Sequence, residues 1–356
     1  MTDTEMFRPN WASPPGDTIA DILGERKLSL ATFSKRIGCT IEDAQDLLAG
    51  RLVMSVSLAR KLHVELGATV EFWMSRDFHY RESVARLSGA ESKDWLADLP
   101  IGDMVRFGWM RPVAAAQEVG ACLRFFDVPD MGAWRAKYAA LQERVAFRFS
   151  PSFESRPGAV AAWLRQGEIE AQGIGCSTWN PTLFQTQLTK ARRLTRQKDP
   201  RKFVPDVRDL CAAAGVAVVI VRAPNGCRAS GATHFLSDQQ ALLQLSFRYL
   251  VDDQFWFSFF HEAGHLLLHG REGFFLEGMG TPASPQEEEA NAFAERILIP
   301  PQWRDEMLSL PTSSHEVIRF ARKIGIAPGI VVGQLQFHHR VKPSHLNGLK
   351  RRFTWG

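Results

Sequence analysis

The five residues from His261 to His265 read His-Glu-Ala-Gly-His, and this HExxH spacing constrains the chain more than any other feature of its sequence. Residues four apart on a helix lie on one face, so both imidazoles can reach a single metal ion. Glu262 projects beside that ion, where a carboxylate can take a proton from a polarised water and return it to a leaving amine. The motif therefore predicts a hydrolytic zinc centre carried by a helix.

The residues around the motif favour a buried central helix. Asp252 is suited to an N-cap, and the aromatic run 255–260 can bury a helix on all sides. Gly264 costs a helix about 1 kcal/mol relative to alanine, which predicts that another segment packs closely against the same turn. A pair of hydrogen-bonded core histidines with no metal is the structural alternative.

A catalytic zinc ion needs a third protein ligand and an open fourth position. The metzincin pattern is excluded, because Leu266–Leu268 and then His269 follow the motif. His269 is better suited to capping the helix or to hydrogen bonding with a ligand than to binding the metal. Glu287, at the start of a predicted helix that ends before Pro300, is the stronger candidate, and Glu288 competes with it because one residue of helix register decides between them. An ordinary acidic helix start is the alternative.

Together, the two segments resemble the ImmA/IrrE family of metallopeptidases. That family combines HExxH with an E-x-x-A-N or E-x-x-A-D segment, followed by F-A and a leucine-rich end before proline. The matching residues are His261, Glu262, His265, Leu266 through His269, Glu287, Ala290, Asn291, Phe293, Ala294 and Leu298 to Pro300.

The resemblance implies a role for each of these polar residues. His261, His265 and Glu287 would bind zinc, Glu262 would be the general base, and Asn291 would hydrogen-bond to a metal ligand. Zinc is the default ion for two histidines and a glutamate, and manganese is compatible with such a site because availability also decides loading.

Two strands are expected before the metal-binding helix. Residues 216–221 form a continuous apolar run typical of a buried strand, and residues 241–247 alternate in part. We hypothesise that the second strand lies at a sheet edge beside the metal, where an extended peptide substrate can add to it. A purely structural strand is the alternative.

Residues 1–80 are predicted to form helices beginning at Ile19 and spanning Ser29 to Ile37 and Ile41 to Leu48. This part resembles five-helix repressor domains of the Xre type and HigA-like antitoxins. The candidate DNA contacts are Lys35, Arg36, Thr40, Gln45 and Arg51. Nine Lys/Arg against eleven Asp/Glu leave a net charge of −2, the opposite of what phosphate binding favours, so a dimerisation or docking module is the alternative.

The predicted fold class is α+β and mostly α, in four parts. Residues 1–80 are expected to be the helix-turn-helix domain, 81–200 a helical connector, and 201–310 a zincin-like peptidase domain with a small β-sheet and the HExxH helix. Residues 311–356 are expected to be a helix-turn-helix-like appendage with a basic tail, which either contacts an acidic partner or DNA or is disordered.

The composition indicates a cytoplasmic protein. No run of eighteen apolar residues occurs and Met1–Glu5 does not begin a signal peptide, so membrane and secreted classes are disfavoured. The five cysteines include no close pair, which fits reduced thiols. The oligomeric state is not encoded in any motif, and a homodimer is compatible with the sequence.

The leading functional prediction is a zinc-dependent endopeptidase. By the family resemblance, it would regulate transcription by cleaving a helix-turn-helix repressor or antitoxin in stress, prophage or mobile-element control. The alternative is a DNA-binding regulator or HigA-like antitoxin of a toxin–antitoxin pair, in which the peptidase fold serves mainly for binding.

Overall fold

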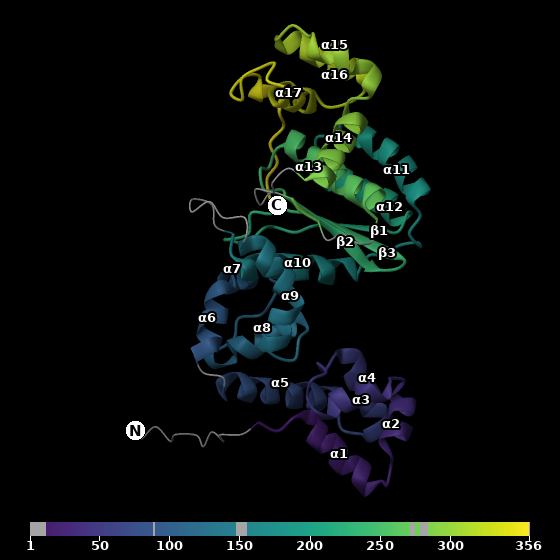
Figure 1. Cartoon of the computed structure of the whole chain (residues 1–356), viewed down its shortest axis with the longest axis vertical. Coiled ribbons are helices and arrows are strands. Elements are labelled where there is room, and N and C mark those ends of the chain that lie inside the picture. The colour runs from purple at the N-terminus through teal and green to yellow at the C-terminus, as the bar shows by residue number, and fades with distance from the viewer. Residues whose placement is uncertain (1–11, 88–89, 147–154, 271–274, 278–283, 356) are drawn as a thin grey trace. The chain divides into compact units, whose positions relative to one another are not determined.

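The computed structural model describes residues 12–87, 90–146, 155–270, 275–277 and 284–355. The chain forms two compact units, residues 1–146 and 147–356. The described part of the first unit is helical, and the second unit combines helices with one small sheet (Figure 1). The predicted α+β class with mostly helical content is confirmed, and the predicted connector, residues 81–200, contains the division between the units.

The first unit begins with five helices: α1 (Pro15–Glu25), α2 (Leu30–Ile37), α3 (Ile41–Leu48), α4 (Val56–Leu66) and α5 (Val70–Leu87). Ser29, Thr40 and Ser55 cap α2, α3 and α4 by accepting backbone N–H groups. The helices expected at 29–37 and 41–48 are therefore present. Their core includes Ile19, Phe33, Leu47, Leu62 and Trp73.

Helix α5 also joins this core to the rest of the first unit. The buried Arg81 forms a bidentate ion pair with Asp77 and donates to the Leu52 and Pro129 carbonyls. The remaining helices are α6 (Ala90–Asp98), α7 (Ile101–Arg106), the 3-10 helix η1 (Ala115–Gln117), α8 (Glu118–Phe126) and α9 (Met131–Ala146).

The second unit is built on four strands: β1 (Val216–Ile220), β2 (Gly231–Ser237), β3 (Gln240–Leu245) and β4 (Phe275–Glu277). Their order is β1-β3-β2-β4. β1 and β3 are parallel, whereas β2 is antiparallel to both β3 and β4. The hypothesis that residues 241–247 form an edge strand is wrong, because β3 lies between β1 and β2 with both of its backbone edges paired.

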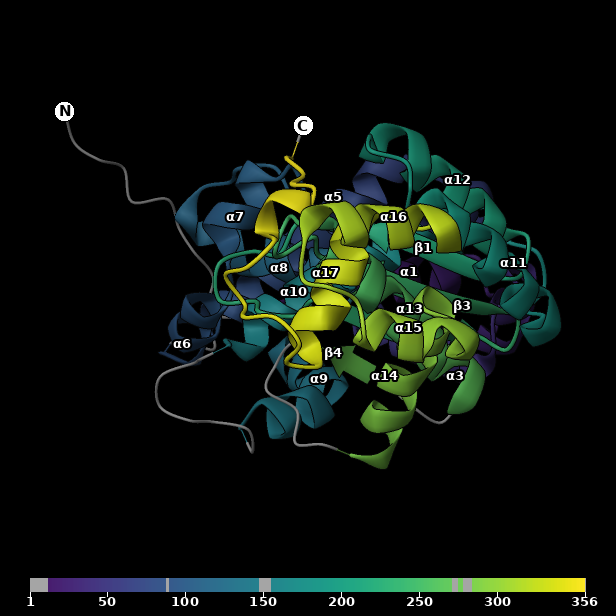
Figure 2. The same cartoon turned by 90° about the horizontal axis from the view of Figure 1, so that it is seen from above.

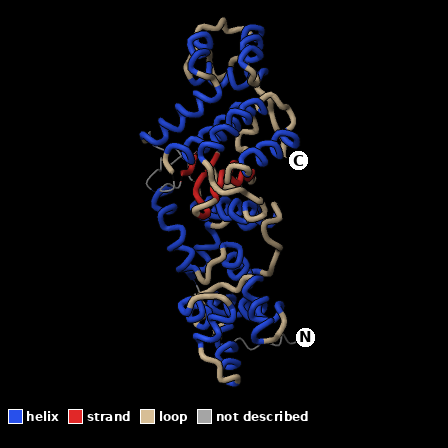
Figure 3. Tube along the Cα trace, turned by 90° about the vertical axis from the view of Figure 1, so that its right-hand side faces the viewer, coloured by secondary structure: helices blue, strands red, loops and turns tan. Residues whose placement is uncertain are grey.

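Helices cover both faces of this sheet (Figures 1 and 3). Helix α10 (Pro157–Ala171) covers one face, where the buried Gln244 donates to the Trp163 carbonyl. Helix α13 (Asp252–Leu268) lies on the other face with α14 (Pro285–Leu298), α11 (Pro181–Leu194) and α12 (Pro200–Ala212). The predicted metal-binding helix is thus at the centre of the unit.

The C-terminal part packs on this helix. It contains η2 (Pro301–Trp303), α15 (Arg304–Leu308), α16 (Ser314–Ile324), α17 (Pro328–Phe337) and η3 (Asn347–Leu349). Helix α17 packs against α13 (Figure 2), and its apolar residues belong to the same core as the sheet. Residues 314–337 form two helices joined by a turn, as expected. Their buried side chains belong to the core of the second unit, so these helices do not form a separate domain.

The basic tail is folded rather than solvated. Lys350 Nζ lies 2.6 Å from Asp253 Oδ2, and Arg351 donates to the carbonyls of Thr195, Arg196 and Gln197. Phe353 is buried. Lys350 and Arg351 therefore bind groups within the unit, and the expectation of a disordered end is wrong for these two residues.

The tail also replaces the predicted N-cap of α13. The N-cap is Val251, which makes no side-chain cap, and Asp252 is the first helical residue. The Asp252 N–H donates to the Arg351 carbonyl, and the Asp252 Oδ1 accepts from the Arg351 N–H. No helix in the described ranges is both long and apolar enough to cross a membrane.

Candidate metal centre and its surroundings

Helices α13 and α14 bring three of the predicted residues together. His261 Nε2 lies 3.0 Å from His265 Nε2 and 3.2 Å from Glu287 Oε2, and His265 Nε2 lies 3.7 Å from Glu287 Oε1. Within the described part of the chain, His261, His265 and Glu287 form a group whose side chains could together hold a metal ion. Glu288 is exposed and lies outside this group.

These spacings fit a zinc ion. Ligands placed 2.0–2.1 Å from a tetrahedral zinc ion are about 3.3 Å apart, and the observed separations lie on either side of that value. Two nitrogens and a carboxylate facing one point also match the donor types that zinc prefers.

The close approach of the two helices depends on Gly264. A Cβ atom at Gly264 would lie 3.0 Å from Phe293 Cδ1 and 3.3 Å from Ala290 Cα. The prediction that another segment packs closely against this turn is confirmed, and the segment is α14. Ser284 caps α14 by accepting the Glu287 N–H, which fixes where this helix starts.

The second nitrogen of each histidine is also engaged. His261 Nδ1 lies 2.9 Å from Asn291 Oδ1, an acceptor, so Nδ1 carries the proton and Nε2 is left with its lone pair. His265 Nδ1 lies 3.0 Å from His269 Nδ1, and His269 Nε2 lies 2.9 Å from Glu289 Oε2. If His269 donates to Glu289, its Nδ1 accepts from His265, and Nε2 of His265 is also left with its lone pair.

The charges of the three candidate ligands influence one another. Burial alone would raise the pKa of Glu287, but the hydrogen bonds and charges of His261 and His265 hold it at about 2. Burial lowers the pKa of His265. At His261 burial acts in the same direction, yet Glu287 and Glu277 outweigh it and raise the pKa. A carboxylate that remains ionised is the form a metal ligand requires.

Glu262 lies on an adjacent face of α13, directed toward β2. Its side chain is fully buried, and neither carboxylate oxygen has a hydrogen-bond partner among the described residues. Burial and the neighbouring carboxylates of Glu277 and Glu287 raise its pKa well above the usual range. A Cβ atom at Gly231 would lie 2.5 Å from Glu262 Oε1, so β2 leaves room for this carboxyl by carrying a glycine there.

Three further residues at the site, Glu277, Ser258 and Phe275, were not predicted from the sequence. Glu277 on β4 pairs with Gly231 in the sheet and hydrogen-bonds Ser258, which lies one turn before Glu262 on α13. Burial raises the pKa of Glu277. The Phe275 ring stacks on the His265 ring with centroids 4.0 Å apart. Because β4 is three residues long, it carries no alternating pattern from which sequence analysis could have identified it.

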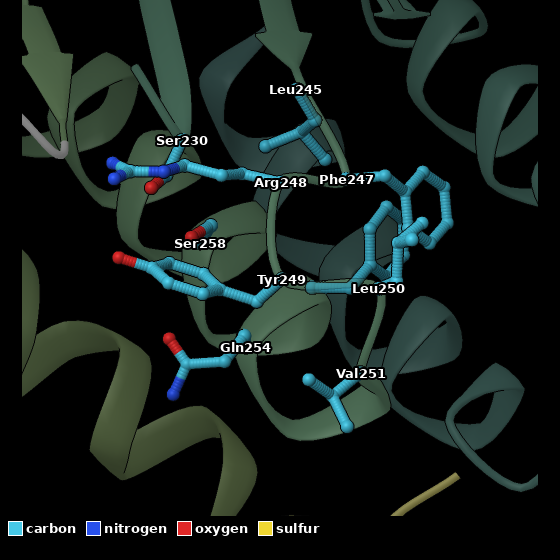
Figure 4. A pocket seen from close by; sticks show the side chains of 10 residues that line it. Ser230, Leu245, Phe247, Arg248, Tyr249, Leu250, Val251, Gln254 and Ser258 are labelled. Carbon is cyan, nitrogen blue, oxygen red and sulfur yellow. The ribbon is translucent and has the colours of Figure 1, made fainter. Parts of the chain in front are cut away.

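The segment that leads into α13 contributes side chains beside Ser258. In Figure 4, Arg248 and Tyr249 project to the same side as Ser258 and Gln254, while Phe247 points the other way. Phe247 stacks on Phe255 with centroids 4.2 Å apart. Phe247 and Leu250 have φ angles of 52° and 51°, a strained conformation for bulky residues, so the packing around them holds this turn in place.

The candidate DNA contacts all lie in the first unit. Arg36 is 2.8 Å from Glu65, and Arg51 is 2.7 Å from Asp46. The Thr40 hydroxyl accepts the Asp43 N–H in a capping box. Lys35 and Gln45 are exposed. Two of the three basic side chains are therefore already paired with carboxylates.

A comparison with protein families gives one match. Residues 217–334 match the model of the IrrE N-terminal-like domain, Peptidase_M78. The match covers the sheet, α13, α14 and most of α17, and it supports a metallopeptidase of the ImmA/IrrE type in this part of the chain. No curated protein matches the chain. No solved structure matches it either.

Proposed function

We propose that the second unit is a zinc-dependent endopeptidase that regulates transcription by cleaving a helix-turn-helix repressor or antitoxin. The observation that carries the proposal is the His261–His265–Glu287 group with the buried Glu262 beside it, inside the region that matches the peptidase family. The repressor as substrate rests on the family resemblance.

Each residue has a distinct task in this proposal. His261, His265 and Glu287 would hold zinc, and a bound zinc ion supplies the Lewis acidity that activates water and the scissile carbonyl. Asn291 and His269 orient the two imidazoles through their Nδ1 atoms. The positive charge of a bound zinc ion would oppose the raised pKa of Glu262 and favour its ionised form. In that form Glu262 would accept a proton from the attacking water and deliver it to the leaving amine nitrogen, so the peptide bond is replaced by a carboxylate and an amine.

The test is cleavage of helix-turn-helix repressors encoded near this protein by the zinc-loaded full chain, with products identified by mass spectrometry. Glu262→Gln keeps the shape of the side chain but cannot carry the proton, so we expect cleavage to fall at least about a hundredfold while zinc is retained. Cleavage by Glu262→Gln at the wild-type rate would refute the proposed role.

The alternative function, a DNA-binding regulator or antitoxin, has less support because Arg36 and Arg51 pair with carboxylates. Under this alternative, the full chain would bind operator DNA with an affinity that falls steeply with salt. Operator binding that survives Glu262→Gln, together with no cleavage by the wild type, would favour the regulator.

A further inference from the structure

A cavity of about 260 Å³ lies between α14, α15 and α17, and none of the three candidate metal ligands lines it. Its volume is several times the ~30 Å³ share of one water molecule, so it can hold a small organic molecule. Its lining includes Glu295, which follows Glu287 by two turns of α14, or about 12 Å along the helix. The cavity is therefore separate from the candidate metal centre.

Part of the lining is apolar. Ile299 and Met307 are buried side chains of the core, and Pro301 adds a third apolar surface. Walls of this kind take up an aliphatic group, while a few polar groups around them fix its orientation.

The polar part of the lining holds a carboxylate between an arginine and a histidine. Glu295 Oε2 lies 3.5 Å from Arg304 Nη2 and 3.5 Å from His338 Nε2. A hydrogen bond from a cationic N–H to a carboxylate is about 2.7–2.9 Å long, so both contacts are loose. Neither oxygen of Glu295 is among the sealed, unpartnered atoms of the described residues, so an ammonium group can reach this carboxylate.

Donors for a second, negatively charged group are also present. Arg296 and Arg304 bring two guanidinium groups to the lining, whereas Glu295 is the single carboxylate among the described residues that form it. Gln334 is only 5% exposed, and its amide makes no hydrogen bond with another described residue. That amide offers a ligand both a donor and an acceptor.

We propose that this cavity binds a free α-amino acid with an aliphatic side chain. The ammonium group donates to Glu295, the carboxylate accepts from Arg304, and the side chain packs against Ile299 and Met307. An α-amino acid carries both charges and one apolar group on a single carbon, which is the combination that these walls and polar groups fit. The inference goes beyond the proposed peptidase function, because this ligand is not the substrate and its site lies outside the metal centre.

The test is isothermal titration calorimetry of the zinc-loaded full chain with three ligands of the same skeleton. These are leucine, 4-methylpentanoate, which lacks the ammonium group, and 3-methylbutylamine, which lacks the carboxylate. We expect leucine to bind at least about tenfold more tightly than either analogue, because each analogue leaves one charged partner in the cavity without its counterpart. No saturable binding of leucine, or an analogue that binds as tightly, would overturn the inference.

Two variants assign the charges to their partners. In Glu295→Gln we expect leucine binding to weaken about tenfold while 4-methylpentanoate binds at least as tightly as in the wild type, a pattern that misfolding would not produce. Glu288→Gln is the same change at an exposed position of the same helix and should leave leucine binding unchanged. Arg304→Met alters a half-exposed side chain and should remove the preference for leucine over 3-methylbutylamine. Wild-type leucine binding in Glu295→Gln or in Arg304→Met would contradict the proposal.

A further variant distinguishes the cavity from the metal centre, because the carboxylate of leucine is also a potential zinc ligand. We expect leucine binding to persist in Glu287→Gln, which alters a candidate zinc ligand outside the cavity. Leucine binding that is lost in Glu287→Gln and retained in Glu295→Gln would place the amino acid at the metal centre and overturn the inference. The proposed peptidase function does not depend on either result.

Discussion

Asn291 on α14 accepts a hydrogen bond from His261 on α13, so its loss should weaken the binding of a metal ion by the candidate ligands. We expect Asn291→Ala to weaken zinc binding about ten- to a hundredfold, since the imidazole loses the partner that fixes its orientation and tautomer. Competition with a zinc-binding dye measures this. Asn291→Asp keeps an oxygen acceptor and should retain most of the affinity; equal losses in both variants would argue against the orienting role.

The buried carboxyl of Asp252 should make the stability of the fold depend on pH. Burial is the main reason its pKa rises from 3.8 to about 6, the hydrogen bond from the Arg351 N–H opposes the rise, and the charge of Asp253 adds to it. Because the folded pKa lies above the unfolded one, the folded state holds the proton more tightly. Ionised Asp252 therefore lowers stability above pH 6, and the cost disappears as the pH falls to about 4.

Asp252→Asn should remove that cost. We expect it to raise the free energy of unfolding by up to about 3 kcal/mol at pH 7.5 relative to wild type and to change it little at pH 4. Asparagine keeps the acceptor oxygen that binds the Arg351 N–H. Urea unfolding of both proteins under identical metal conditions measures the difference. An effect that is the same at both pH values would contradict the explanation.

At the scale of elements, the geometry of the candidate metal centre depends on how closely α13 and α14 approach. Gly264→Val places two methyl groups against Ala290 and Phe293, which would separate the helices that carry the three ligands. We expect the free energy of unfolding of Gly264→Val to fall by about 1–3 kcal/mol and its zinc content to be lower than that of the wild type. Gly102→Val is the control, since a Cβ atom there meets nothing within 4 Å. Full zinc content in Gly264→Val would show that the close approach is dispensable.

The tail is the second element on which α13 depends. Arg351 donates to three carbonyls beyond the end of α11, and its backbone caps α13. We expect Arg351→Ala to lower the free energy of unfolding by about 1.5–3 kcal/mol, which is the range for the loss of hydrogen bonds to a charged group. The neighbouring Arg352 is exposed, so Arg352→Ala should stay within about 0.5 kcal/mol of wild type. Thermal unfolding compares the two, and similar melting temperatures would contradict the assignment.

Across the whole molecule, the sequence was informative where local periodicity decides the outcome. The positions of His261, His265 and Glu287 follow from helix spacing and from two helices that must meet, and the structure brings them together. Glu277 and Gly231 were missed because their proximity depends on β2 pairing with a three-residue strand. The central place of β3 was missed for a related reason, since strand order is set by tertiary contacts.

The tail shows the limit of composition as a guide. A run of lysine and arginine at a chain end is typical of a solvated segment. Here, however, Lys350 forms an ion pair with Asp253, and Arg351 donates hydrogen bonds to the carbonyls that follow the end of α11. The match to the peptidase family continues to residue 334, which agrees with α17 being part of the same core. The role of the first unit in recognising DNA or a repressor stays a prediction.

The central claim is that His261, His265 and Glu287 form a zinc site, and metal content tests it most directly. After zinc loading and dialysis, elemental mass spectrometry should find about one zinc per chain in the wild type and in Glu288→Gln, and well below one in Glu287→Gln. A wild type that retains no zinc, or a Glu287→Gln variant that retains as much as Glu288→Gln, would contradict the account.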